Sequence, residues 1–442
     1  MPTSVFLGAL GCPVDSSVGA AAVGTRCCGL GSVGRLGIGV VVKILLLTHR
    51  PMHPIHDGYN LHNYNYVKRL AVDHELHLVS LEPPAGESQG EAQLPEDLGK
   101  MFASTCILPA RSLVKPRGFR RVLGALSPDD LHDFDPAVYV AVLKVMEQHH
   151  IDLVWTAGAK MLVYSHRLGL PTLGDIADEA VKEARIDLSR AGSFFDWVRA
   201  WRSYLQTWRF QRKYLEHVSI CTVVSETDKE TLNSHCPGLE VRVVPNGVDH
   251  ETYAPQGVPE DFPSLVFEGT MNFRPNEEGI QDFVKEVLPL ILKQRPDVKL
   301  FIVGKDPIDG VKALASDGVT VTGFVDDVKP WVEKSSVFVC PLKRGTGIKN
   351  KILQAWSLER PVVATTVSCG GLPLIEGVNM EVADDPKLFA EKVLALLDDP
   401  KRRATMGRFA RQTAIEKCSW ELAMAKMQDI LNAVVRAPKS RA

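Results

Sequence analysis

Residues Pro341 to Pro361 read P-L-K-R-G-T-G-I-K-N-K-I-L-Q-A-W-S-L-E-R-P. The apolar run before this stretch, Val337–Cys340, has the length and β-branching of a buried strand. Gly345 and Gly347 allow a tight turn with bare backbone N–H groups. Residues 348–358 are compatible with a helix, and the next strand begins at the final proline. The stretch therefore predicts a strand, a glycine turn, a helix and a second strand.

This order presents backbone amides and the positive end of a helix dipole to an anion. Four basic residues crowd the same turn: Lys343, Arg344, Lys349 and Lys351. Positive charge at a helix N-terminus opposes the dipole, and a bound phosphate or diphosphate would offset it. The competing interpretation is an ordinary βαβ crossover, in which the glycines only shape the turn and the basic side chains are solvated.

The composition is that of a soluble globular protein with 442 residues, long enough for roughly two or three domains. A net charge of -2 gives no global field that favours nucleic acid. The nine cysteines contain no CxxC pair, so we interpret them as reduced, structural thiols of a cytosolic protein.

The N-terminal residues 1–40 are rich in Gly, Ala, Val and Ser and lack the basic start of a signal peptide. We expect them to be a poorly ordered extension, with the folded chain beginning near Val41. No apolar run reaches the roughly 20 residues that a membrane span needs.

Short β-branched apolar runs alternate with helix-compatible segments along the rest of the chain, which predicts doubly wound parallel sheets. We expect strands at 41–48, 75–81, 104–108, 152–156, 171–176, 220–225, 241–244, 264–268, 299–303, 319–322, 337–340 and 361–365. We expect helices at 60–72, 276–293, 308–315, 328–334, 348–358, 386–397 and 401–417.

These elements divide into two α/β halves. Residues 41–245 form the first predicted domain and residues 246–419 the second. The final helix, within 420–442, is expected to cross back onto the first domain. A substrate is expected in the cleft between the two halves.

Two stretches combine basic residues with apolar ones at helical spacing. Residues 111–127 are basic and amphipathic, and residues 197–214 carry six aromatic side chains among arginines. Both patterns suit a membrane surface or a lipid-linked acceptor. The alternative is that the aromatic side chains belong to the core and the basic ones to a solvated face.

Five stretches carry a resemblance to a known family: V-V-P-N-G-V-D (243–249), F-E-G-T-M-N-F-R-P-N (267–276), V-T-G-F-V-D-D-V (321–328), G-I-K-N-K-I-L-Q-A (347–355) and R-P-V-V-A-T (360–365). With them, most of residues 42–435 resembles family 4 of the glycosyltransferases, which has the GT-B fold. The chain is more closely similar to sugar transferases of exopolysaccharide and exosortase (PEP-CTERM) gene clusters.

The resemblance implies transfer of a sugar from a nucleotide-diphospho-sugar, such as a UDP- or GDP-sugar, to a glycan, a lipid-linked or a small-molecule acceptor. It implies a donor on the second half, an acceptor on the first, retention of anomeric configuration and no bound metal. The residues agree on the last point, because no Asp-x-Asp pair or His/Cys cluster has convincing metal spacing. We expect a cytoplasmic enzyme, peripheral at the inner membrane face through 111–127, with no nucleic-acid partner.

By position, the resemblance assigns donor contacts to the following residues: Gly269, Gly345, Thr346, Gly347, Ile348 and Gln354. Lys351 should supply positive charge to the diphosphate, with Arg274 as a second candidate. A surface arginine before a helix-starting proline is the competing interpretation for Arg274. Two carboxylates of the family are missing, because Thr346 and Gln354 stand where relatives carry glutamate. A glutamine still bonds to ribose hydroxyls, but more weakly than a carboxylate.

The loop after the first predicted strand supplies further candidates. Gly58 allows close backbone approach, and His56 or Asp57 is placed to receive the acceptor proton. Asp175 and Asp178, after the fifth predicted strand, are alternative bases. Polar loop residues and capping or turn residues are the competing interpretations.

Two functions of other classes remain open. A nucleotide-sugar 2-epimerase uses the same fold, although no set of carboxylates and histidines argues for it. A non-catalytic protein that binds nucleotide-sugars, or a scaffold, would explain the two missing carboxylates.

Overall fold

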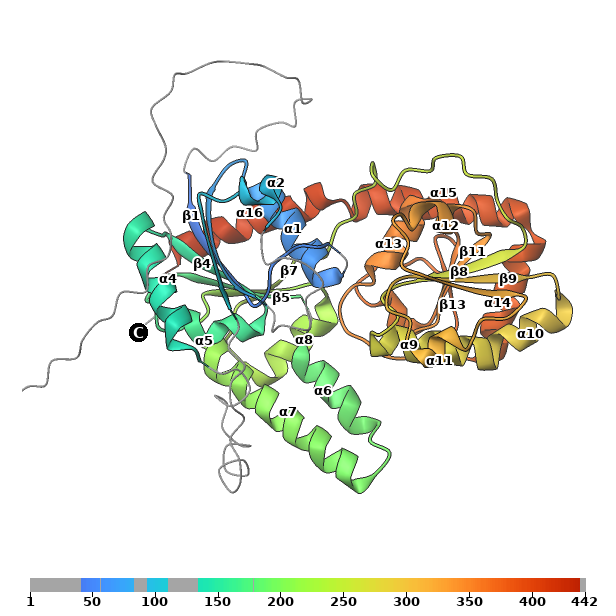
Figure 1. The fold of residues 1–442 in the computed structure, drawn as a ribbon, viewed down its shortest axis with the longest axis horizontal. Coiled ribbons are helices and arrows are strands. Elements are labelled where there is room, and N and C mark those ends of the chain that lie inside the picture. Colours follow the sequence, from blue (N-terminus) through green and yellow to red (C-terminus); the bar gives the residue numbers. More distant parts are fainter. Residues whose placement is uncertain (1–40, 56, 83–93, 110–133, 178, 438–442) are drawn as a thin grey trace, which may run out of the picture. The chain divides into compact units, whose positions relative to one another are not determined.

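The structure, a computed structural model, describes residues 41–437 apart from 56, 83–93, 110–133 and 178 (Figure 1). It contains two parallel sheets, one of seven strands in the order β3-β2-β1-β4-β5-β6-β7 and one of six in the order β10-β9-β8-β11-β12-β13. In each sheet the order reverses direction beside the first strand, as in doubly wound folds. The predicted α/β class is confirmed.

The strands of the first sheet are β1 (Lys43–Thr48), β2 (Glu75–Glu82), β3 (Ser104–Pro109), β4 (Leu153–Ala157), β5 (Thr172–Ile176), β6 (Ile220–Val223) and β7 (Val241–Val243). Those of the second are β8 (Ser264–Glu268), β9 (Lys299–Val303), β10 (Val319–Gly323), β11 (Val337–Cys340), β12 (Val362–Ala364) and β13 (Glu381–Val382). The central strands are buried along nearly their whole length, because helices cover both faces of a parallel sheet.

The longer helices of the first half are α1 (Gly58–Leu70), α4 (Pro136–His149), α6 (Ala180–Ser189), α7 (Phe194–Leu215) and α8 (Glu226–His235), with the short α2 (Glu96–Gly99) and α5 (Leu162–Ser165). The second half has α9 (Arg274–Asp282), α10 (Leu288–Gln294), α11 (Asp309–Lys312), α12 (Lys329–Glu333), α13 (Asn350–Ser357), α14 (Pro386–Asp398) and α15 (Pro400–Lys417). The last helix is α16 (Trp420–Arg436).

Several elements differ from the sequence-based expectation, and helices α4, α6 and α8 were not among those expected. The single helix expected at 276–293 is divided into α9, a π-helical turn at Phe283–Val287 and α10. Pro289 explains the division, because it has no N–H to donate and its ring clashes with the preceding turn. The helix expected at 308–315 shrinks to α11, and the short edge strand β13 was not predicted.

Two predictions lie outside the described residues, namely those for the extension 1–40 and for the amphipathic stretch 111–127. In the part of the chain that the structure does describe, no helix is long and apolar enough to cross a bilayer.

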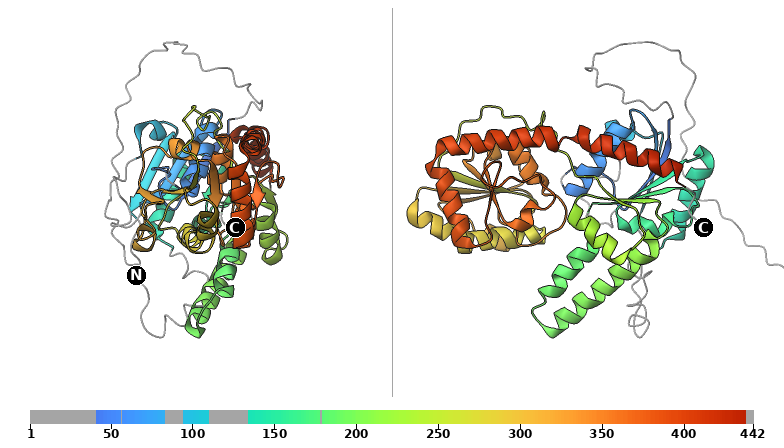
Figure 2. Two further views of the ribbon diagram at one scale, coloured as in Figure 1. Left: turned by 90° about the vertical axis from the view of Figure 1, so that its right-hand side faces the viewer. Right: turned by 180° about the vertical axis from the view of Figure 1, so that it is seen from behind.

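The final helix α16 packs into the core of the first sheet. Its buried face shares one apolar cluster with strands β1, β2 and β4 and with helix α1, and Figure 2 shows it beside that sheet. Trp420 is 1% exposed and meets the ring of Tyr66 edge-on, with ring centroids 5.5 Å apart. A β-carbon on Gly247 would lie 2.5 Å from the backbone nitrogen of Trp420. The chain before β8 therefore touches the start of α16 through bare backbone.

Gly247→Ala is expected to lower the free energy of unfolding by about 1–3 kcal/mol, because the added methyl group overlaps the Trp420 backbone rather than a movable side chain. Urea denaturation followed by tryptophan fluorescence measures the change. The matched control is Gly99→Ala, where an added β-carbon meets nothing within 4 Å. Equal stability of the two variants would contradict this account of Gly247.

Candidate functional site

The glycine turn follows β11 at the carboxyl end of the second sheet. Gly345 and Gly347 have φ angles of 126° and 67°, which a side chain would disfavour. Ile348 is 9% exposed and packs against Gly371, where an added β-carbon would lie 2.8 Å from its Cγ1. Packing therefore fixes the turn in place before α13 begins at Asn350.

The backbone N–H groups of this turn lack partners. Among the described residues, none accepts a hydrogen bond from the amides of Gly345, Thr346, Gly347 and Ile348. Gly347 and Ile348 are buried, and buried amides in proteins are almost always paired. Four consecutive free donors beside a helix N-terminus form a nest for an anion.

Lys351 stands in the first turn of α13. Its Nζ donates to the carbonyl oxygen of Glu268 at 2.5 Å and to Oδ1 of Asn276 at 2.8 Å. It also lies 4.4 Å from the centroid of the Phe267 ring. Burial lowers the pKa of Lys351, although nearby Cys340 and Glu268 act in the opposite direction. The site thus holds a desolvated cation close to the end of β8.

Two glycines make room at the ends of β8 and β9. A β-carbon on Gly304 would lie 1.8 Å from the carbonyl oxygen of Gly269, and one on Gly269 would lie 2.6 Å from Nζ of Lys351. The strand ends therefore meet through bare backbone and leave space for the lysine. Gly269, one of the predicted donor-binding residues, borders Lys351 directly.

The other basic residues of the turn already have partners. Lys343 pairs with Asp282 at 2.8 Å and with Glu286 at 3.0 Å. Arg344 is 3% exposed and binds Glu183, at 3.0 Å, and Asp187. Their charge needs no phosphate to offset it, contrary to the expectation from the sequence.

Lys349 also bonds within the protein. Its Nζ folds back onto the carbonyl oxygens of Thr346 and Gly347. Among the four basic residues of the turn, Lys351 is therefore the one placed beside the ends of β8 and β9.

The two remaining candidates of the second half, Arg274 and Gln354, bond to other residues than Lys351 does. Arg274 opens α9, is 64% exposed at its side chain and bonds to Glu278 at 2.6 Å. This exposed position agrees with the competing interpretation, a surface arginine before the proline that starts a helix. Gln354 donates to the hydroxyl of Tyr253 at 2.9 Å, and burial raises the pKa of that tyrosine.

A cavity of about 340 Å³ lies on the first half of the chain. It opens at the carboxyl ends of β1, β4 and β5 and is closed by α1 and α7. The lining includes His49, Tyr59, His62, Asp175, Phe210 and Gln211. Tyr59 donates to the carbonyl oxygen of Ala157 at 3.2 Å, and burial raises its pKa. The cavity combines apolar walls with a few fixed polar groups, as small-molecule sites do.

A chain of hydrogen bonds runs from this cavity to Asn350, the first residue of α13. Asp175 Oδ2 lies 2.8 Å from His62 Nε2, and its Oδ1 accepts from the Thr222 hydroxyl at 2.9 Å. His62 Nδ1 lies 2.6 Å from Asn246 Oδ1, whose amide donates to Asn350 Oδ1 at 3.1 Å. The bonds are all satisfied when each nitrogen of the His62 ring carries a proton. Asn350 opens the helix that follows the glycine turn.

The loop candidates of the first half have structural partners. Asp57 caps α1 by accepting from the amide of Asn60 at 2.9 Å and pairs with Arg50 at 2.9 Å. Gly58 is the first residue of α1, and a β-carbon there would lie 3.6 Å from Nδ2 of Asn350. His56 and Asp178 lie outside the described residues.

Sequence reasoning missed His62 and the role of Asn246. His62 falls inside a predicted helix, where polar residues are usually assigned to the solvent side. The available signal was the run Asn60, His62, Asn63 and Asn65, four polar residues that α1 buries.

Capping after β5 is performed by Glu179, a buried carboxylate that accepts from the amides of Val181 and Lys182. Burial raises the pKa of Glu179.

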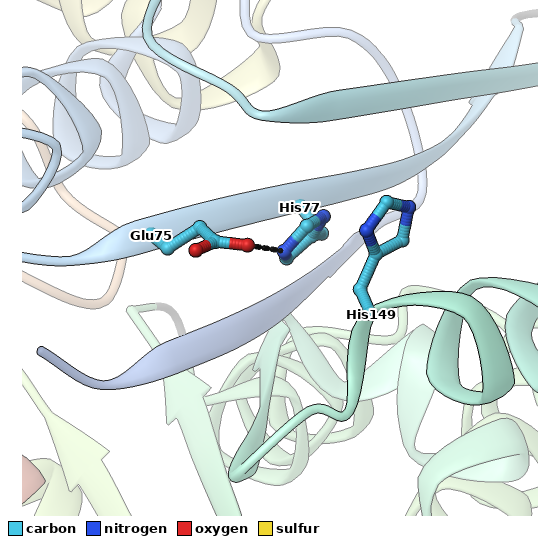
Figure 3. A group of neighbouring side chains, drawn as sticks. All are labelled: Glu75, His77 and His149. Atoms are coloured by element: carbon cyan, nitrogen blue, oxygen red, sulfur yellow. Dashed lines mark hydrogen bonds and ion pairs between the residues drawn. The ribbon is translucent and has the colours of Figure 1, made fainter.

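The structure also brings together three groups able to bind a metal, Glu75, His77 and His149 (Figure 3). Glu75 and His77 share one face of β2, and His149 ends α4. The two imidazole rings are tilted by 32° with centroids 4.3 Å apart, and the ammonium of Lys43 lies 3.6 Å from the Glu75 carboxylate. The lysine already neutralises the carboxylate, and Nε2 of His77 is hydrogen-bonded to Oε1 of Glu75 at 3.0 Å, so the charge and the hydrogen bonds of this group are balanced within the protein. We interpret the group as a structural hydrogen-bond cluster at the amino edge of the sheet, opposite the cavity.

Comparisons with known families agree with this architecture. Residues 56–252 match the family model described as Glycosyltransferase Family 4, and residues 262–399 match the one described as Glycosyl transferases group 1. Together the two matches cover β2–β7 of the first sheet and all strands of the second.

A similar curated protein is the GDP-mannose-dependent monoacylated alpha-(1-6)-phosphatidylinositol monomannoside mannosyltransferase of Corynebacterium glutamicum. It is 30% identical over 254 residues, which are 51% of this chain and 65% of that protein. The match thus spans just under two thirds of the relative.

Solved structures share the fold at low sequence identity. Sucrose-phosphate synthase from Thermosynechococcus elongatus has a TM-score of 0.67 at 16% identity, over 88% of this chain and 98% of that one. Anabaena HepE, solved in complex with UDP and glucose, has a TM-score of 0.60 at 16% identity, over 88% of this chain and 99% of that one. The predicted GT-B fold, two Rossmann-like domains, is confirmed.

Proposed function

We propose that this chain, which belongs to the family 4-like glycosyltransferases, transfers a sugar from a nucleoside-diphosphate sugar to an acceptor. The Corynebacterium relative is named for GDP-mannose, and Anabaena HepE was solved with UDP. The proposal takes the donor class from these relatives and the position of its diphosphate from the geometry of this chain.

The observation that carries the proposal is the row of unpaired amides at Gly345 to Ile348. In sugar transfer, negative charge grows on the departing diphosphate as the bond to the sugar breaks. Preorganised N–H donors aimed at that charge stabilise the transition state without having to reorient. Lys351, held by the end of β8, adds a positive charge in the first turn of α13, directly after these amides.

We propose that this charge stabilisation replaces a metal ion and that the reaction retains anomeric configuration. In such a reaction the departing phosphate oxygen takes the proton of the acceptor hydroxyl, and the bond from that hydroxyl to the sugar forms on the same face. The chain's own residues then bind and orient the two substrates. This role suits Asp175, whose oxygens are occupied by His62 and Thr222, better than the role of a base.

The acceptor is proposed to bind in the cavity of the first half. Its walls offer Tyr59 and Phe210 as apolar surface and the His62–Asp175 pair as a fixed polar group. Because the chain of hydrogen bonds from His62 reaches Asn350, the acceptor cavity and the start of α13 are mechanically connected.

We place the reaction in the cytoplasm. Six cysteines are free in the part of the chain described, five of them buried, which suits a reducing compartment. A peripheral membrane contact through 111–127 stays a prediction, since that stretch lies outside the described residues.

Lys351→Ala is expected to reduce kcat by about 10²-fold or more, by analogy with the loss of other preorganised donors to a developing anion. A donor screen with UDP- and GDP-sugars first identifies a substrate, and release of nucleoside diphosphate is then measured. The matched control is Lys343→Ala, because that lysine pairs with Asp282 and Glu286. Wild-type turnover by Lys351→Ala would remove this residue from the mechanism.

The pH profile should show the state of Lys351. An exposed lysine loses its proton near about pH 10.4. Because burial lowers the pKa of Lys351, its ammonium loses the proton at a lower pH as the solution is made alkaline. Activity is therefore expected to fall on the alkaline side before surface lysines lose their charge. Lys351→Arg should move this fall to higher pH, because arginine stays protonated up to about pH 12. An alkaline limb that does not move in this variant would assign the titration to another group.

A further inference from the structure

Helix α7 exposes a regular row of apolar side chains. Phe194, Trp197, Val198 and Trp201 follow the i, i+3, i+4, i+7 spacing of one helix face. Their exposed fractions are 72%, 45%, 40% and 41%, and the neighbouring Phe195 is 83% exposed. The rings of Trp197 and Trp201 are stacked, with centroids 6.2 Å apart and planes 15° apart. We call these five side chains the α7 stripe.

The stripe does not belong to the core. Buried residues of α7 are confined to its last turns, at Phe210, Gln211, Tyr214 and Leu215. Figure 1 shows α6 and α7 side by side, extending away from the strands of the first sheet. The sequence left open whether the aromatic residues of 197–214 are core. The core interpretation holds for the end of the helix and fails for its beginning.

Positive charge accompanies the stripe. Between Phe194 and Leu215 the helix carries one acidic residue, Asp196, against five basic ones: Arg199, Arg202, Arg209, Arg212 and Lys213. Arg199 is 81% exposed at its side chain and pairs with Asp196 at 2.6 Å, and Arg202 lies one residue after Trp201. Nearer the end of the helix, the guanidinium of Arg212 lies over the ring of Trp208 at 4.8 Å. Exposed aromatic residues together with arginines on one helix are typical of helices that lie in a membrane interface.

We propose that the α7 stripe docks the protein on an anionic lipid surface. The tryptophan and phenylalanine rings enter the headgroup region, and the arginines beside them bind lipid phosphates. The contact lies in the plane of the interface and does not cross the bilayer.

A lipid surface fits this face better than a second copy of the chain. A twofold dimer would pack two copies of the same arginine-rich helix against each other, which brings like charges close together. Protein interfaces also take about 20–30 residues from each partner. Five apolar residues near the start of one helix are few for such an interface, but they suffice for insertion into headgroups.

The stripe and the cavity lie on the same helix, so docking on a lipid surface would bring a lipid-linked acceptor near the cavity. Thr207, Phe210 and Gln211 of the same helix line the cavity. From Phe194 to Thr207 the helix rises about 20 Å, at 1.5 Å per residue. An acceptor carried by a lipid would therefore meet the cavity along α7. This purpose rests on the proposed function, whereas the docking itself does not.

The test uses the full-length protein and sedimentation with two kinds of vesicle, phosphatidylcholine alone and phosphatidylcholine with phosphatidylglycerol. Wild-type protein should bind the anionic vesicles, and high salt should weaken the binding by screening the arginines. Trp197→Ser with Trp201→Ser should weaken it about tenfold or more, because both rings leave the interface. The matched control is Phe409→Ser with Ile415→Ser, two exposed apolar residues of α15 that should leave binding unchanged.

Circular dichroism and thermal melting check that each variant is folded. Nucleotide release with a water-soluble acceptor, once a substrate pair is known, should be equal in wild type and in the tryptophan variant, which separates docking from catalysis. The proposal is overturned if wild type binds neither vesicle or if the tryptophan variant binds as wild type does. It is also overturned if light scattering shows a dimer that the tryptophan variant loses, since the stripe would then join two copies.

Discussion

Four backbone N–H groups between β11 and α13 have no acceptor among the described residues, and the rest of the second half is arranged around them. Leaving a buried amide unpaired is costly, and Gly347 and Ile348 are buried, so their free N–H groups point to a use in binding. Here the positive φ angles of the two glycines, the packing of Ile348 and the start of a helix together fix the conformation of the turn. The nearby Lys351 is desolvated, which strengthens its attraction for an anion.

The first half contains a buried polar network that reaches the start of α13. Asp175, His62 and Asn246 are buried side chains that use their hydrogen-bonding capacity on one another and on Asn350. A fully satisfied buried network makes its members rigid, and this one connects the cavity wall to the first residue of α13. Arg344 adds a second connection, because it joins the glycine turn to two carboxylates of α6.

Much of the fold was predictable, because buried parallel strands appear in the sequence as short β-branched runs between turn residues. The limits of β8, β9 and β11 agree with their predicted limits to the residue. The interrupted helix around Pro289 was less predictable, since whether a proline ends a helix or only disturbs it depends on tertiary packing. The nest at Gly345 to Ile348 was visible because its residues are contiguous in the sequence. The pairing of Arg344 with α6 and the meeting of His62 with Asp175 were not, because these residues are far apart along the chain.

The central claim is that a diphosphate binds to the amides of residues 345–348. A crystal structure of the protein soaked with UDP or GDP tests this most directly. The account predicts phosphate oxygens within hydrogen-bonding distance of those N–H groups, with Nζ of Lys351 turned toward them. Phosphates bound at another place, with the turn unchanged and its amides occupied by water alone, would contradict it.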